Sequence, residues 1–210
     1  MNSIVFFDYA GIAVFAATGA LAASRKELDI VGFLFFAGVT AIGGGTLRDI
    51  VLDAPVFWVN NTDYLIIPAV VAVAVFFTAH LFESRYKLLL WLDAVGISAY
   101  CVFGAWKGLT LTGSPLVAVV MGVLTATFGG VLRDMLAGEQ SVLLRPEIYV
   151  TAALAGAGVY TIARVLQVVL LLAALLGFAA AFAIRGGALR FGWSIPPYRS
   201  RPGRRPEDIP

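Results

Sequence analysis

The stretch Ala41–Asp49 reads AIGGGTLRD, and a near copy, TFGGVLRD, occupies Thr127–Asp134. Both stretches lie in apolar surroundings, where a glycine run is costly because each glycine in a helix is worse than alanine by up to about 1 kcal/mol. Each run is followed by Leu-Arg-Asp, which places two charges beside apolar sequence. The question is what a chain gains by keeping this unfavourable combination twice.

The composition is that of a membrane protein. Hydrophobic residues make up 60% of the 210 residues, and charged residues only 13%. A lipid bilayer needs about 20 apolar residues for each spanning helix. Seven segments meet or approach this length, and we expect an all-α membrane protein with spans at 3–23, 28–47, 64–82, 88–106, 115–133, 147–164 and 165–184.

The segment after the seventh span has a different character. Residues 185–210 contain six arginines and five prolines, which predicts a basic, disordered tail. If the N-terminus lies outside, Arg48, Lys107 and Arg164 are the three basic residues on the outer side, and the other twelve lie inside. Because cytoplasmic loops are rich in Lys and Arg, this distribution predicts an outer N-terminus and a cytoplasmic C-terminus.

The two glycine motifs belong to a longer repeat with an offset of 85 residues. Matched positions run without a gap from residue 8 to residue 64 of the first copy, and they include the pairs Asp8 and Asp93, Gly19 and Gly104, Thr40 and Thr125, Arg48 and Arg133, Asp49 and Asp134, and Tyr64 and Tyr149. Three spans per copy is an odd number, so the second copy must be inverted in the membrane. We therefore expect repeat one at 3–82, an inverted repeat two at 88–164, and a seventh helix at 165–184 outside the symmetry.

The glycines have two interpretations. Because glycine weakens a helix, the runs could kink or unwind the second and fifth spans, and the freed backbone groups could line a path for a small solute or ion. Alternatively, the glycines could simply allow close helix packing. The first interpretation makes the following residues the candidate path: Gly43, Gly44, Gly45, Gly129 and Gly130.

The charges after the glycines also have two interpretations. Arg48-Asp49 and Arg133-Asp134 could border the two mouths of one path, since charge near hydrocarbon usually faces a bundle interior. They could instead end a span at the interface, with a snorkelling arginine, or clamp a kinked helix. Four matched polar residues are secondary candidates, the carboxylates as interfacial groups, cation-attracting sites or partners for the arginines: Asp8, Asp93, Thr40 and Thr125.

Other functional classes receive little support. The chain has one cysteine, Cys101, and one histidine, His80, and neither has the partners that a metal site or a nucleophile–base pair requires. We expect Cys101 to be a small buried hydrophobe. The sequence predicts no enzyme, no cofactor, no metal site and no nucleic-acid partner.

Small residues also recur at helical spacing outside the motifs. Gly11, Gly19 and Ala23 share one helical face, and their counterparts in repeat two do the same. We expect these faces to pack inside the subunit. The seventh span has the same spacing at Ala173, Gly177 and Ala181, and this face could pack on the repeats or on another subunit.

The duplicated Gly-Gly-x-Leu-Arg-Asp motif, the seven spans and the inverted repeat resemble the bacterial branch of the trimeric intracellular cation channel family. The resemblance covers roughly residues 3–184 and implies a homotrimer in the bacterial inner membrane, surrounded by lipids. It further implies one pore per subunit for K⁺ and Na⁺, between helices kinked at the glycines. The second motif has Phe128 where the first has Gly43, so its kink could be tighter.

This branch also carries the label of a putative glycine transporter. The alternative to a channel is therefore a secondary transporter of glycine or a similar small solute, with a closed site at mid-membrane. A membrane scaffold without transport activity would not explain paired helix breaks.

Overall fold

A computed structural model describes residues 3–82, 84–141 and 148–196, with side chains from residue 8 onward. The elements in these ranges are helices, which confirms the all-α prediction. Their bounds are α1 Ser3–Arg25, α2 Ile30–Val51, α3 Phe57–Asn60, α4 Asp63–Thr78, η1 Ala79–Leu81 (a short 3₁₀-helix), α5 Arg85–Thr112, α6 Pro115–Leu136, α7 Val150–Val165 and α8 Leu170–Phe191.

Each expected span overlaps one helix, in chain order α1, α2, α4, α5, α6, α7 and α8. Five of the helices, α2, α4 with η1, α5, α6 and α8, are long and apolar enough to cross a membrane, whereas α7 is shorter at 16 residues. The short helix α3, between α2 and α4, was not expected. How many of the helices cross the bilayer stays a prediction.

Several helices continue past the expected end of their span. α2 ends at Val51 and α6 at Leu136, so both Arg-Asp pairs lie inside helices rather than after them. α5 continues to Thr112 and includes Lys107. The reason is that a hydropathy boundary marks the first charge, while backbone hydrogen bonding continues until the chain turns.

The boundary between the seventh span and the tail was also wrong. α8 occupies Leu170–Phe191, not 165–184, and it ends at Gly192 in a left-handed conformation. Arg185 therefore lies in a helix and is buried, not in a disordered tail. The expected tail beyond residue 196 lies outside the described residues.

The two motif helices, α2 and α6, cross at their glycines. A Cβ added to Gly44 would overlap the carbonyl oxygen of Thr125 on α6, and one added to Gly129 would overlap the carbonyl oxygen of Thr40 on α2. The 85-residue offset converts the first contact into the second, because Gly44 matches Gly129 and Thr40 matches Thr125. The contact between the two halves is therefore reciprocal. An approximate two-fold axis passes through the crossing.

A second reciprocal contact joins α1 and α5. Gly11 lies against the ring of Tyr100, and Gly96 lies against the ring of Phe15, which are again matched pairs. The two rings meet near the axis, with their centroids 5.2 Å apart. The axis relates α1–α2 to α5–α6 as an inverted pair.

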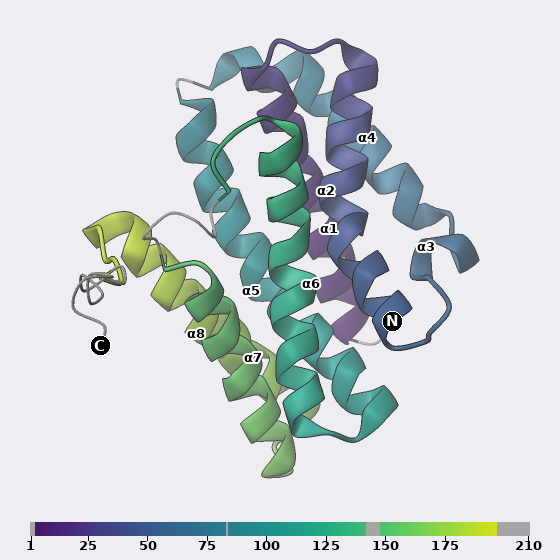
Figure 1. Ribbon diagram of the computed structural model, residues 1–210, viewed down its shortest axis with the longest axis vertical. Coiled ribbons are helices and arrows are strands. Elements are labelled where there is room, and N and C mark those ends of the chain that lie inside the picture. The colour runs from purple at the N-terminus through teal and green to yellow at the C-terminus, as the bar shows by residue number, and fades with distance from the viewer. Residues whose placement is uncertain (1–2, 83, 142–147, 197–210) are drawn as a thin grey trace, which may run out of the picture.

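The inversion places the two charged motifs far apart. α2 and α6 run in opposite directions, so their C-terminal ends lie at opposite ends of the molecule (Figure 1). We call these the Arg48 end and the Arg133 end. The α5–α6 turn lies at the Arg48 end, and the α1–α2 turn lies at the Arg133 end.

The glycine runs do not unwind their helices. α2 and α6 are continuous α-helices through Gly43–Gly45 and Gly129–Gly130. The expected exposure of backbone groups by unwinding is therefore wrong, because the glycines instead allow two backbones to approach closely. A bend at these positions stays a prediction.

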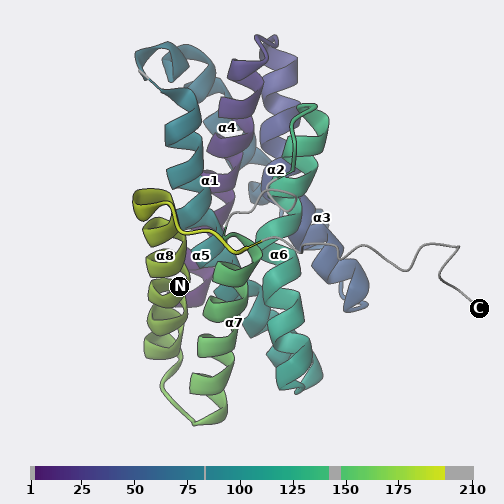
Figure 2. The same cartoon turned by 60° about the vertical axis from the view of Figure 1, so that its left-hand side comes forward.

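α7 and α8 form an antiparallel pair that packs beside α5 and α6 (Figure 2). They cross at Gly156 and Gly177, where a Cβ on either residue would lie 2.9 Å from the carbonyl oxygen of the other. Ala173, Gly177 and Ala181 are buried in this packing. The small-residue face of α8 therefore packs inside the subunit.

Candidate functional site

The first charged motif lies in a buried ion-pair group at the Arg48 end. Arg48 Nε donates to Asp49 Oδ1 over 2.7 Å, and Lys107 Nζ of α5 lies 2.8 Å from the same oxygen. The other oxygen of Asp49 accepts from the backbone N–H of Phe57 over 3.1 Å. The guanidinium of Arg48 also lies over the ring of Phe103, 5.1 Å from its centroid.

Asp8 is the second carboxylate of this group. It is buried, and its Oδ2 accepts a hydrogen bond from the hydroxyl of Tyr64 on α4 over 2.7 Å. Asp8 was expected to be an interfacial carboxylate, a cation-attracting site or a partner of Arg48; its bonded partner is Tyr64. We call Asp8, Arg48, Asp49, Tyr64 and Lys107 the Arg48 cluster.

The second motif lies in a matching group, the Arg133 cluster. Arg133 Nη1 donates to Asp93 Oδ1 over 2.8 Å, and its Nη2 donates to Asp134 Oδ1 over 2.9 Å. Tyr149 lies at the start of α7 with the guanidinium of Arg185 over its ring, 5.3 Å from the centroid. The cluster consists of Asp93, Arg133, Asp134, Tyr149 and Arg185.

The charges of both Arg-Asp pairs are deeply buried. Exposed fractions range from 0% for Asp49 to 6% for Asp134. Each cluster holds two cationic and two carboxylate side chains, so their formal charges balance. Removing one partner of a buried pair typically costs about 3–5 kcal/mol, because the other charge is left uncompensated. Each pair also contacts neighbouring elements, Asp49 through Phe57 and Lys107 and Arg133 through Asp93. A role as path mouth or as clamp stays a prediction.

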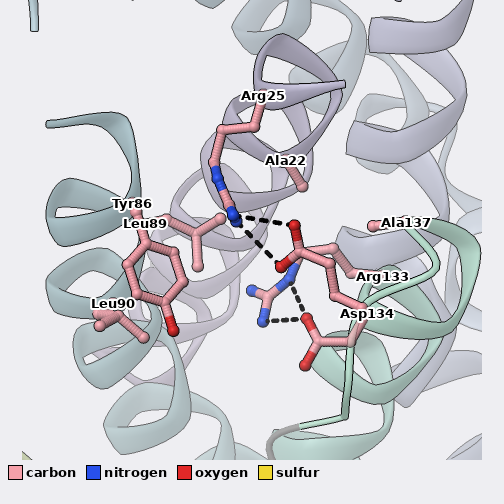
Figure 3. Close-up of a pocket in the computed structure, with 9 residues that line it drawn as sticks. Ala22, Arg25, Tyr86, Leu89, Leu90, Arg133, Asp134 and Ala137 are labelled. Carbon is pink, nitrogen blue, oxygen red and sulfur yellow. Dashed lines mark hydrogen bonds and ion pairs between the residues drawn. The ribbon is translucent and has the colours of Figure 1, made fainter. Parts of the chain in front are cut away.

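A small hollow lies over the Arg133 cluster. Its floor includes Arg133 and Asp134, and its rim carries Arg25 from the end of α1 (Figure 3). Arg25 forms two bonds to the carboxylate of Glu139, of 2.9 and 3.0 Å, and its guanidinium lies 4.6 Å from the centroid of the Tyr86 ring.

The position of Glu139 follows from the end of α6. Gly138 adopts a left-handed conformation with φ 62°, and the N–H of Glu139 bonds back to the carbonyl of Asp134 over 2.9 Å. α2 ends in the same way, with Asp53 at φ 50° and Ala54 bonded to the carbonyl of Asp49. Under the 85-residue offset, Ala54 at the Arg48 end matches Glu139 at the Arg133 end.

The other sequence candidates lie between the clusters. Thr40 and Thr125 are buried, and each hydroxyl donates to a carbonyl of its own helix over 2.6 Å. Their backbone carbonyls face the glycines of the opposite helix. Cys101 is buried, as expected.

Sequence reasoning missed the roles of Lys107, Arg185, Tyr64 and Tyr149. The two tyrosines were matched in the repeat but received no role. Lys107 could have been noticed as a lysine with no basic counterpart, since the matched position holds Ala22. Arg185 was hidden by the early end that we gave to the seventh span.

Comparison with known proteins agrees with this geometry. A family model described as "Glycine transporter" matches the chain twice, at residues 5–80 and 90–165. A solved structure of a trimeric intracellular cation channel orthologue from Rhodobacter sphaeroides superposes with a TM-score of 0.89. The two are 49% identical, over 92% of this chain and 100% of that one.

The chain belongs to the bacterial branch of the trimeric intracellular cation channel family. The resemblance noted from the sequence is confirmed. A prokaryotic channel of the family has a TM-score of 0.85 at 25% identity, over 91% of this chain and 98% of that one.

Relatives within the family are described as membrane proteins. A "UPF0126 membrane protein" of Vibrio cholerae is 38% identical, over 93% of this chain and 82% of its own length. The "UPF0126 inner membrane protein YadS" of Escherichia coli (strain K12) is 37% identical, over 93% and 96%. This member of the cation channel family is a multi-pass protein of the inner membrane.

Proposed function

We propose that this chain is a cation channel that passes K⁺ and Na⁺ through one path in each subunit of a homotrimer. The observation that supports this most strongly is its likeness, over almost its whole length, to a solved structure described as a trimeric intracellular cation channel orthologue. We place the path along the crossing of α2 and α6, with the Arg48 cluster at the outer mouth and the Arg133 cluster at the cytoplasmic mouth. The Lys and Arg distribution supports this orientation.

We interpret the close contact at the crossing as the closed state of this path. Gly44 and Gly129 lie against backbone carbonyls of the opposite helix, so no ion fits between the helices there. Opening requires α2 and α6 to separate or bend at the glycines. The same carbonyls of Thr40 and Thr125 would then face the path, and carbonyl oxygens can replace the hydration shell of a cation.

The carboxylates of the two clusters would favour cations at each mouth. In a narrow mouth with low-dielectric walls, charge has a larger effect on ions than on an open surface. Asp49→Asn should therefore lower the current of cations that enter from outside. Asp53→Asn is the matched control, because Asp53 is exposed at the same end and asparagine tolerates its left-handed conformation.

The deciding experiment is a recording from the purified protein in a planar bilayer. We expect unitary current steps in KCl that reverse at the K⁺ potential under a salt gradient. Unchanged currents in Asp49→Asn would refute the assignment of the mouth, and the absence of unitary steps would refute the channel.

The alternative, a secondary transporter of glycine or a similar small solute, has support from the description of the matching family and from the closed crossing. An inverted repeat also suits alternating access. Vesicles containing the protein should then show saturable uptake with counterflow and no unitary currents.

A further inference from the structure

Matched residues in the two halves bond differently. In repeat one, the hydroxyl of Tyr64 donates to Asp8 Oδ2, and no hydrogen bond joins Arg48 to Asp8 among the described side chains. In repeat two, the matched arginine, Arg133, is bonded to the matched carboxylate, Asp93. The aspartate of each half is therefore held by a different partner.

Tyr149, the matched tyrosine of repeat two, lacks the hydrogen bond that Tyr64 makes. Within the described part of the chain, Tyr149 Oη and Asp93 Oδ2 are both buried without a hydrogen-bond partner. Their counterparts, the Tyr64 hydroxyl and Asp8 Oδ2, are the two atoms that bond in repeat one. Leaving two such groups buried and unsatisfied is costly, so the arrangement needs a reason.

Sequence differences between the halves explain which partner is chosen. The Arg48 guanidinium lies over the ring of Phe103, whose matched residue in repeat one is the smaller Thr18. Lys107 pairs with Asp49, and its matched residue in repeat one is the uncharged Ala22. These contacts draw Arg48 away from Asp8, which is left to Tyr64. Arg133 has no such contacts among the described residues and reaches Asp93.

We propose that Tyr64 and Tyr149 are positioning residues that exchange with the arginines for the same aspartates, one half being tyrosine-bonded while the other is arginine-bonded. In the second conformation, Arg48 bonds Asp8 and Tyr149 bonds Asp93. In the exchanged state each half adopts an arrangement that the other half already shows, and the contacts of Phe103 and Lys107 favour the described state over it.

The elements that move with the exchange are connected through the axis. Tyr64 belongs to α4 and Tyr149 to the start of α7, so the exchange shifts these helices against α1 and α5. α1 and α5 meet at Phe15 and Tyr100, and the Tyr100 hydroxyl donates to the Ala41 carbonyl of α2 over 3.4 Å. A shift at one cluster is thereby passed to the crossing and to the other cluster.

The exchange itself does not depend on what the protein transports. Its effect on current rests on the proposed function, since only a channel would show it as a change in open probability. A spectroscopic readout at Tyr149 therefore separates failure of the exchange from failure of the channel.

The test places 3-fluorotyrosine at position 149 of the full-length protein in lipid nanodiscs and records its ¹⁹F spectrum. Tyr64→Phe removes the bond that stabilises the described state. Lys107→Ala gives the Arg48 cluster an alanine where the matched position, Ala22, already holds one. Both should raise the hydrogen-bonded population at position 149, by on the order of tenfold to a hundredfold for the loss of one bond to a charged group. Tyr9→Phe is the control, because Tyr9 stacks on Tyr64 with centroids 5.0 Å apart and its hydroxyl accepts a hydrogen bond from Asn61 Nδ2 over 3.3 Å.

A reciprocal arm places the label at position 64 and replaces Tyr149 with phenylalanine. This variant loses a hydroxyl without a partner, so it should fold, and the bonded population at position 64 should be kept or increased. If Tyr64→Phe and Lys107→Ala both leave the Tyr149 spectrum unchanged, the asymmetry is permanent and the proposal is wrong. Should Tyr64→Phe fail to fold, Lys107→Ala decides alone.

Discussion

Replacing Gly44 with alanine tests the role of the glycine motif most directly. The added methyl group would overlap the Thr125 carbonyl oxygen, a backbone atom that cannot turn aside. Overpacking of this kind typically costs about 1–3 kcal/mol, while the better helix propensity of alanine returns up to about 1 kcal/mol. We expect a net loss of stability of up to about 2 kcal/mol or a forced separation of α2 from α6.

The same helix offers a matched control. Gly38 also lies in α2, but a Cβ there would meet no described group within 4 Å. Gly38→Ala should therefore keep only the gain in propensity. Because both variants share this gain, they should differ by the overpacking cost alone, about 1–3 kcal/mol. Gly129→Ala should repeat the result for Gly44→Ala, because it would overlap the Thr40 carbonyl across the axis.

The assay is thermal unfolding of the purified variants in detergent, followed by size-exclusion chromatography, together with current in planar bilayers. The current separates two accounts of the motif. If the crossing must open for ions to pass, forced separation should change open probability. Equal unfolding temperatures for Gly44→Ala and Gly38→Ala would refute the close contact itself, and equal currents would refute its part in permeation.

Three further outcomes follow from the structure. Arg133→Gln should lower stability by about 3–5 kcal/mol in thermal unfolding, because two carboxylates lose their partner; a loss below about 1 kcal/mol would contradict the buried contacts. Arg185→Gln should be more destabilising than Arg190→Gln on the same helix, since only Arg185 is buried, and similar unfolding temperatures would argue against the packing of α8. A chain cut after Pro196 should insert and conduct like the full chain, as judged by trimer size and current, since the cut keeps α8, which ends at Phe191. Loss of current alone would give the tail a role in conduction.

Much of the fold could be predicted from the sequence because its signals are local or repeated. Apolar segments of about 20 residues gave the helices, and an offset of 85 residues with three spans per copy indicated the inversion. The helix ends were less predictable. Arg48 and Arg133 were expected at span ends because charge usually avoids hydrocarbon, but both are neutralised inside the protein and the helix continues.

The glycine motif shows why the site was harder to predict than the fold. A weakened helix and a close helix crossing have the same local sequence, and only the partner that faces Gly44 distinguishes them. The partners in each cluster come from helices distant in sequence, such as Lys107 on α5 for Asp49 of α2. Local sequence shows the sign of each charge, but it does not show how far a helix continues and therefore which distant charge its end contacts.

The glycines and the charges belong to one arrangement. The glycines bring α2 and α6 together at the axis, and one turn beyond the glycines each helix carries an arginine that its aspartates must neutralise. Because a buried arginine without a carboxylate is costly, any movement that separates the crossing must preserve an acidic partner for Arg48 and Arg133. Asp49 and Asp134 travel on the same helices as these arginines and can do so. Asp8 and Asp93 lie on α1 and α5, so their bonds are the ones that a movement of α2 or α6 must break or form. The aspartate next to each arginine thus allows the helices to move without leaving the arginine unpaired. The partners of Asp8 and Asp93, in contrast, change with the position of the helices.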